Sequence, residues 1–302
     1  MKIIVLILLP VLVVWGIARG GEWVYAKVVE GRYQDWERSV ERDPDGVRIG
    51  CREFTIGEGK TALLLIHGFG DSPALFTQMA SMLAQCGYTC RAARLPGFAE
   101  PMERYQKTDR GQWMENIRDQ IAVLRKTHDS VWVIGHSTGA TLGIQTVLND
   151  VDAVEGLILL APLLQVSSKR SPILTSEQWF RISRPLLHRT QFLETAFPVD
   201  ADDPVAKGYA YRDQFVPVPV YDELFALMAG VRDQGKKVLV PVMMVLAEQD
   251  QVVDNEAAHK FWETLPPVRQ RLIVQPDAGH VVPIDTGWKR LVEEIDAFIQ
   301  ST

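Results

Sequence analysis

Ser137, Asp250 and His280 lie far apart in the sequence, but together they have the side-chain types that nucleophilic catalysis requires. A serine hydroxyl is a poor nucleophile near neutral pH unless a base removes its proton during the attack. The usual base is a histidine whose ring is oriented by a carboxylate. If these residues meet in the fold, they would attack a carbonyl carbon and form an acyl-enzyme. The rest of the sequence must supply the elements that bring them together.

The serine lies in the stretch VWVIGHSTGAT, residues 131–141, between Gly135 and Gly139. Its first residues are apolar on both alternating faces, which is typical of a buried strand in a parallel sheet. The residues after Gly139 favour a helix. A tight strand-to-helix turn strains its central residue and requires small neighbours, and it lifts the serine oxygen clear of the sheet. Taken alone, the pentapeptide would also fit an ordinary glycine-rich turn.

Candidate partners for the serine follow the last two predicted strands. Asp250 ends the apolar stretch 239–250, and His280 follows the last one. The order serine, aspartate, histidine is the chain order of the fold that carries such a serine turn. Asp254 is an alternative carboxylate, but it suits the N-cap of the next helix. Asp277 is close to His280 in sequence and is better explained as a loop residue.

The attack also requires donors for the negative oxygen that forms on the carbonyl, and loss of one donor typically costs about 3 kcal/mol of barrier. The stretch LLLIHGFGDSP, residues 63–73, ends a predicted strand in a glycine-containing loop. We expect the backbone amides of Phe69 and Thr138 to form this oxyanion hole, with Phe69 also lining the acyl pocket. Alternatively, Gly68 and Gly70 only close a turn.

The elements that must position these residues alternate along the chain. Apolar strands are predicted at residues 61–68, 89–96, 130–137, 154–162, 239–250 and 270–280. Amphipathic helices are predicted near 73–85, 110–127, 139–149, 221–234, 254–264 and 286–300. An antiparallel strand or hairpin is expected at 47–57. This alternation predicts an α/β fold, with a mostly parallel central sheet, helices on both faces and chemistry at the carboxyl ends of the strands.

We assign residues 46–164 and 221–302 to this α/β core, because residues 165–220 interrupt the alternation. That interval is rich in proline and aromatic residues. A structureless loop of this length is improbable in a compact domain, so we expect a small helical insertion that forms a lid over the strand ends. The alternative is an insertion that only pads the surface.

The N-terminal residues carry an apolar run, IIVLILLPVLVVWGIA, at positions 3–18. As a helix it would span about 24 Å, less than the roughly 30 Å of a bilayer core. We expect residues 1–19 to be a single-pass membrane anchor, or alternatively a signal segment that is cleaved on export. Residues 20–45 would be a polar, partly helical connector.

Composition bears on several other functional classes. A hydrophobic fraction of 47% and a charged fraction of 23% are ordinary for a globular protein. A net charge of -6 without a basic run argues against a nucleic-acid partner. The cysteines, Cys51, Cys86 and Cys90, match no zinc-ligand spacing, and a Cys86–Cys90 disulfide would require an oxidising compartment. We expect neither metal nor cofactor.

Taken together, these motifs resemble the α/β-hydrolase superfamily, especially its capped bacterial carboxylesterases, monoacylglycerol lipases and lysophospholipases. The resemblance covers about residues 60–300 and is carried by HGFGDSP (67–73), GYTCRAARLPGF (87–98), GHSTG (135–139), AEQDQVV (247–253) and DAGHVV (277–282). It implies that Ser137 is the nucleophile, His280 the general base and acid, and Asp250 the orienting carboxylate. It also implies that the amides of Phe69 and Thr138 are the oxyanion donors.

The chain departs from the commoner pattern GHSxGG, since it reads GHSTGAT and carries Thr141 near the pocket floor. Dehalogenases and epoxide hydrolases of this fold use an aspartate at the elbow, so the serine argues against them. We expect a serine hydrolase of carboxylic esters, such as monoacylglycerols or lysolipids. The alternatives are a thioesterase, an amidase or peptidase, a perhydrolase, an acyltransferase, or a catalytically inactive membrane-bound binding module.

Overall fold

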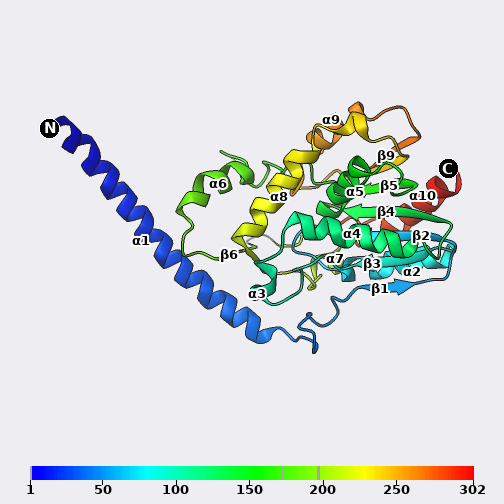
Figure 1. Ribbon diagram of the computed structural model, residues 1–302, viewed down its shortest axis with the longest axis horizontal. Helices are drawn as coiled ribbons and strands as arrows, with labels where there is room; N and C mark the ends of the chain where they lie inside the picture. The colour runs from blue at the N-terminus through cyan, green and yellow to red at the C-terminus, as the bar shows by residue number, and fades with distance from the viewer. Residues whose placement is uncertain (1, 172, 196–197) are drawn as a thin grey trace.

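The computed structural model describes residues 2–171, 173–195 and 198–302, with side chains described from residue 19 onward. Within these residues, helices cover both faces of a seven-stranded sheet (Figure 1). The strand order is β1-β3-β2-β4-β5-β8-β9, and neighbouring strands are parallel except for β1 with β3. This architecture confirms the predicted fold class.

The strands of the sheet lie inside the predicted stretches. They are β1 (Phe54–Ile56), β2 (Thr61–Ile66), β3 (Thr89–Ala93), β4 (Ser130–His136), β5 (Gly156–Leu160), β8 (Val242–Ala247) and β9 (Gln270–Gln275). In β4, Val133 is buried in the core on one side of the sheet and Ile134 in the core on the other. Since helices cover both sides, the central strands are apolar throughout rather than alternating.

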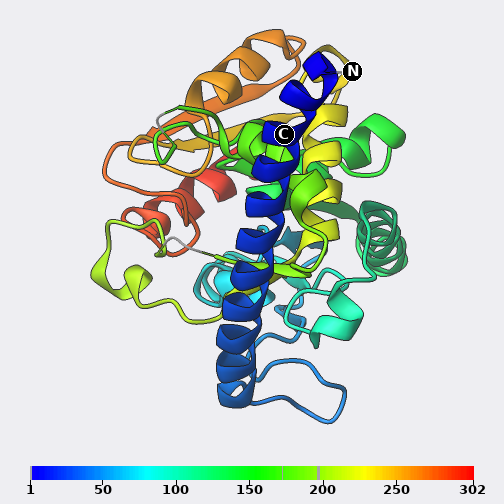
Figure 2. The same ribbon diagram turned by 90° about the vertical axis from the view of Figure 1, so that its left-hand side faces the viewer.

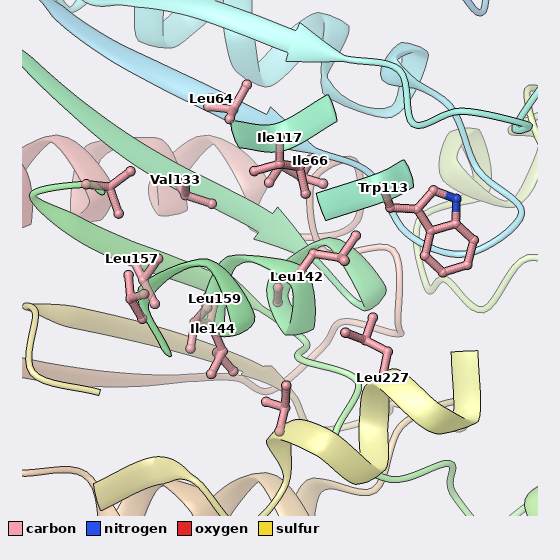
Figure 3. Packing of buried hydrophobic residues seen from close by; sticks show 14 of the residues in the cluster. Leu64, Ile66, Trp113, Ile117, Val133, Leu142, Ile144, Leu157, Leu159 and Leu227 are labelled. Atoms are coloured by element: carbon pink, nitrogen blue, oxygen red, sulfur yellow. The ribbon is translucent and has the colours of Figure 1, made fainter. Parts of the chain in front are cut away.

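Two layers of helices enclose this sheet. One face carries α2 (Thr77–Gln85) and α10 (Trp288–Gln300); the other carries α4 (Arg110–Leu124), α5 (Thr138–Asn149), α8 (Val218–Val231) and α9 (Asn255–Thr264). Figure 3 shows the second layer, where Trp113 of α4 and Leu142 of α5 lie in the same core as Val133 of β4. The shorter helices are η1 (Pro73–Phe76), α3 (Met102–Tyr105) and η3 (Gly235–Lys237).

The parallel arrangement determines where the candidate residues gather. The loops after β2, β4, β8 and β9 all lie at the carboxyl edge of the sheet, because these strands run in the same direction. These loops carry Phe69, Ser137, Asp250 and His280. The sheet therefore brings to one edge residues that are up to about two hundred positions apart in sequence.

Segment 165–220 is not purely helical, in contrast to the predicted helical insertion. The segment follows β5 and ends in the first turn of α8. It contains α6 (Ser176–Ser183), η2 (Arg184–Leu186) and α7 (Pro204–Lys207). It also contains β6 (Phe192–Glu194) and β7 (Phe215–Pro217), which pair antiparallel as a separate two-stranded sheet. Strands this short do not produce a recognisable alternation, so the sequence indicated helices alone.

The N-terminal helix α1 (Lys2–Ser39) extends well beyond the apolar run and packs against segment 165–220 (Figure 2). Val29 is buried beside Phe192 and Phe215. The carboxylate of Glu22 accepts hydrogen bonds from the amides of Arg189 and Thr190 at 2.7 and 2.9 Å. Residues 20–39 of the predicted connector are therefore part of a helix that is fixed to the body.

The predicted membrane location is corrected by the structure. In the part of the chain whose side chains are described, no helix is long and apolar enough to cross a membrane. The prediction of a single-pass anchor, and of a membrane partner, is therefore wrong on this finding. It rested on hydropathy alone, whereas α1 continues into polar sequence and forms protein contacts. The side chains of residues 1–18 lie outside the described residues.

Candidate active site

Ser137 occupies the turn between β4 and α5 in a strained backbone conformation. Its φ and ψ are 53° and -113°, and it is the N-cap residue of α5. Its amide donates to the carbonyl of Leu160 at 2.9 Å, and its carbonyl accepts from the amide of Leu163 at 3.2 Å. A positive φ at a non-glycine residue persists only when the surrounding structure enforces it. Contacts with the end of β5 and the residues after it provide that constraint.

The glycines on either side of this turn are required by close contacts. A Cβ atom on Gly139 would lie 2.1 Å from the carbonyl oxygen of Ile66. A Cβ atom on Gly135 would lie 2.4 Å from the amide nitrogen of Ala140. Neither neighbour can move away, because both are backbone atoms of the sheet or its helix. The GxSxG spacing thus fits the crowding that a tight strand-to-helix turn creates.

His280 and Asp250 are directly hydrogen-bonded. Nδ1 of His280 donates to Oδ2 of Asp250 at 2.8 Å, and the amides of Val252 and Val253 donate to the other carboxylate oxygen at 2.7 and 2.9 Å. Burial raises the pKa of Asp250, but the His280 ring and these amides outweigh it and hold the pKa below its usual value. The ionised carboxylate therefore keeps the proton on Nδ1 and leaves Nε2 able to accept one.

Ser137 and His280 line one cavity of about 150 Å³ at the carboxyl edge of the sheet. Both residues are largely buried, with exposed fractions of 4% and 8%. Within the described residues, the Ser137 hydroxyl makes no hydrogen bond, so the serine and the histidine share the cavity without being directly bonded. Catalytic hydrogen bonds are often long in the absence of substrate and tighten when it binds.

The residues predicted as oxyanion donors are close to Ser137 in different ways. Phe69 lines the cavity, and a Cβ atom on Gly68 would lie 3.2 Å from Cβ of Ser137. Thr138 is the first residue of α5, and the first amides of a helix have no acceptor within the helix. Neither amide donates a hydrogen bond within the described part of the chain. Both amides therefore retain a donor that no group of the described chain uses.

His67 and His136 are buried close to this cavity but form structural hydrogen bonds. Nδ1 of His67 donates to the carbonyl of Gly68, and Nε2 accepts from the amide of Leu95. Nε2 of His136 donates to the carbonyl of His280 at 2.8 Å. Burial lowers the pKa of His67 to about 4 and that of His136 to about 3. Both are neutral rings that hold loops in place, which leaves His280 as the candidate base.

The alternative carboxylates have other surroundings. Asp254 caps α9 by accepting from the amides of Glu256 and Ala257. Asp277 is exposed at the surface.

The cysteines of the described chain are free thiols. The acidic, histidine and cysteine side chains of the described residues form no group of three or more that could hold a metal ion.

Asp200, in segment 165–220, connects the two loops that carry the acid and the base. One oxygen of its carboxylate accepts from the amides of Gln251 at 2.8 Å and His280 at 3.3 Å, and the other accepts from Arg170 at 3.0 Å. Its carbonyl accepts from the amide of Val281 at 3.2 Å. Asp200 could not be predicted from the sequence, because no motif or periodicity surrounds it.

Replacing Asp200 with alanine is expected to lower kcat for ester hydrolysis about tenfold to a hundredfold, with a smaller change in KM. The substitution leaves two amides without their acceptor and loosens the loops that align acid and base. Asp200→Asn keeps an acceptor oxygen and should restore part of kcat. Asp202→Ala, at an exposed side chain on the same loop, is the matched control. Wild-type kcat in Asp200→Ala would show that this contact does not align the site.

Comparisons with known proteins show which family the chain belongs to. A sequence model of the family described as "Serine aminopeptidase, S33" matches residues 57–287. A carboxylesterase of Bacillus subtilis (strain 168) is 21% identical over 250 residues, which cover 82% of this chain and 96% of that protein. A thermostable monoacylglycerol lipase of Bacillus sp. (strain H-257) is 21% identical, with coverage of 82% and 93%.

Solved structures show the same fold. The crystal structure of a monoacylglycerol lipase from Paleococcus ferrophilus superposes with a TM-score of 0.71 at 18% identity, covering 82% of this chain and 98% of that one. A soluble variant of a monoglyceride lipase from Saccharomyces cerevisiae gives a TM-score of 0.72 at 14% identity, with coverage of 82% and 91%. At such identities the likeness establishes the architecture and leaves the substrate to be argued from the site.

Proposed function

The chain belongs to the serine aminopeptidase S33 family of α/β hydrolases, and from this premise we propose that it cleaves carboxylic esters by attack of Ser137 on the substrate carbonyl. The observation that carries the proposal is the hydrogen bond of 2.8 Å between His280 and Asp250, beside a cavity that the serine also lines. An inactive binding module would have no use for a buried base held in one tautomer by an ionised acid.

In the proposed reaction, Nε2 of His280 takes the proton of the Ser137 hydroxyl while its oxygen bonds to the carbonyl carbon. The amides of Phe69 and Thr138 hold the negative oxygen of the tetrahedral intermediate. His280 then gives the proton to the departing alcohol as the ester bond breaks, which leaves an acyl-serine. Water then attacks the acyl carbon while His280 takes its proton. The bond between the acyl carbon and Oγ of Ser137 breaks, His280 returns the proton to Oγ, and the carboxylic acid is released.

We further propose that segment 165–220 acts as a lid over this site. The proposal is supported by five residues of this segment that line the cavity, namely Arg170, Thr195, Pro198, Asp200 and Arg212. Apolar side chains such as Leu163, Leu224 and Val281 complete the wall. A cover of this kind excludes water from an acyl group. Monoacylglycerols and lysolipids are the substrates we favour, because two curated relatives are named a carboxylesterase and a monoacylglycerol lipase.

A hydrolysis assay with an ester, a thioester and an anilide tests which class of bond the protein cleaves. The purified chain is incubated with a decanoyl ester of glycerol, with the decanoyl thioester of coenzyme A and with alanine p-nitroanilide, and product release is followed. We expect the ester to be turned over fastest. The anilide tests for an aminopeptidase, which the family's description names. Cleavage of the anilide or thioester with the ester left intact would contradict the proposal.

A further inference from the structure

Arg212 places a positive charge in the cavity that holds Ser137 and His280. The side chain is half-buried and lines the cavity together with Phe69 and Asp71 of the loop after β2. Its guanidinium is close enough to Asp71 and His136 to lower the pKa of each by its charge. The charge therefore acts inside the site rather than on the outer surface of segment 165–220.

The backbone around Arg212 is fixed to the loop that carries Phe69. The amide of Asp213 donates to the carbonyl of Gly70 at 2.7 Å, and Oγ of Ser72 donates to the carbonyl of Tyr211 at 3.1 Å. The carbonyl of Arg212 itself accepts from Arg48 at 2.6 Å. Hydrogen bonds on either side of the residue thus hold its backbone beside the predicted oxyanion hole. A group placed in this way is preorganised for a ligand.

Across residues 19–171, 173–195 and 198–302, the guanidinium of Arg212 makes no ion pair and no hydrogen bond. The other arginine of the cavity, Arg170, is paired with Asp200 at 3.0 Å. Arginine presents several donors in a plane that matches a carboxylate or a phosphate. An arginine inside a binding cavity without an acidic partner is therefore suited to an anion brought by the ligand.

Two acidic side chains, Asp71 and Asp200, line the same cavity, and Asp200 is already paired with Arg170. The environment of Asp71 weakens its attraction for the guanidinium of Arg212. Asp71 accepts hydrogen bonds from the hydroxyl of Tyr209 at 2.7 Å and from the amide of Ser72 at 2.8 Å. Burial raises its pKa to about 6, although these bonds and Arg212 act in the opposite direction. No ion pair between Asp71 and Arg212 is found within the described side chains.

We propose that Arg212 selects acyl esters whose alcohol part carries an anionic group, either a phosphate or a carboxylate, near the ester bond. This inference rests on the proposed ester hydrolysis and narrows its substrate class. A charge-assisted contact of this kind is expected to change kcat/KM about tenfold to a hundredfold. Neutral esters with the same acyl chain lack the contact and serve as the reference.

The test compares the full chain with its Arg212→Gln variant on three decanoyl esters: 1-decanoylglycerol, 1-decanoylglycerol 3-phosphate and decanoyl glycolate. The quantity measured is the ratio of kcat/KM for each anionic ester to that for the neutral one, so that any general loss of activity cancels. We expect a ratio above one in the wild type and a fall of about tenfold or more in Arg212→Gln. The two anionic esters show whether phosphate or carboxylate is preferred.

Two further variants keep the result interpretable. Arg212→Lys retains the positive charge, so its kcat/KM ratio should be higher than that of Arg212→Gln. The ratio should still be lower than in the wild type, because lysine lacks the planar set of donors of arginine. Arg118→Gln, at an exposed arginine of α4, should leave the ratio unchanged. Hydrolysis of all three esters with a ratio that Arg212→Gln does not alter would overturn this inference alone. Absence of hydrolysis of every ester would overturn the proposed function and this inference with it.

Discussion

Replacing Ser137 with alanine is expected to lower kcat for ester hydrolysis about 10⁶-fold. The substitution removes the oxygen that forms the acyl-enzyme, and the hydroxyl of the next residue, Thr138, belongs to the first turn of α5 rather than to the strained N-cap position. The side chain makes no hydrogen bond within the described residues, so thermal unfolding should change little. Steady-state hydrolysis of 1-decanoylglycerol, with far-UV circular dichroism as the control for folding, measures both effects.

A residual rate within tenfold of wild type in folded Ser137→Ala protein would assign the nucleophile to another residue. Thr141 provides a matched comparison on the same helix, because its hydroxyl is buried and donates to the carbonyl of Leu163 at 2.6 Å. Thr141→Val removes a hydroxyl of the same neighbourhood without touching the proposed nucleophile. We expect it to lower stability while retaining most of kcat.

Replacing Asp250 with asparagine is expected to lower kcat about 10⁴-fold. The asparagine oxygen can still accept from the amides of Val252 and Val253, so the loop should keep its shape. Its amide group would then face Nδ1 of His280 as a donor. The ring is forced into the tautomer with its proton on Nε2, and that nitrogen can no longer take the proton of Ser137.

Asp254→Asn is the matched control for this experiment, because Asp254 lies in the same loop and caps α9. Asparagine is as good an N-cap as aspartate, and the change should leave kcat close to wild type. The pH dependence of kcat/KM distinguishes a tautomer effect from misfolding. If Asp250→Asn retained wild-type kcat, or if both variants lost activity equally, Asp250 would not be the residue that orients the base.

The central sheet and its edge residues could be predicted because local sequence and global fold agree there. Strands buried on both faces are apolar on both, as in residues 131–134 of β4 and in β5, and the helices between them carry their own apolar stripe. Gly135 and Gly139 mark the turn because backbone atoms lie where their Cβ atoms would be. Once the strands are parallel, their carboxyl ends meet, and the candidate acid and base follow from chain order.

The parts that could not be predicted depend on contacts between distant segments. Asp200 and Arg212 lie in segment 165–220, where irregular backbone replaces periodic elements, and their partners are residues of other loops. The strands β6 and β7 are too short to show an alternation. The predicted membrane anchor was wrong for a related reason, since hydropathy alone does not reveal that α1 continues and packs on the body.

In the proposed mechanism His280, oriented by Asp250, activates Ser137 as a nucleophile. The most direct measurement is labelling with a fluorophosphonate probe, followed by mass spectrometry of the peptides. We expect a single adduct on Ser137 in the wild type and little or no adduct in Ser137→Ala and His280→Ala. An adduct on a different residue, or undiminished labelling of Ser137→Ala, would contradict it.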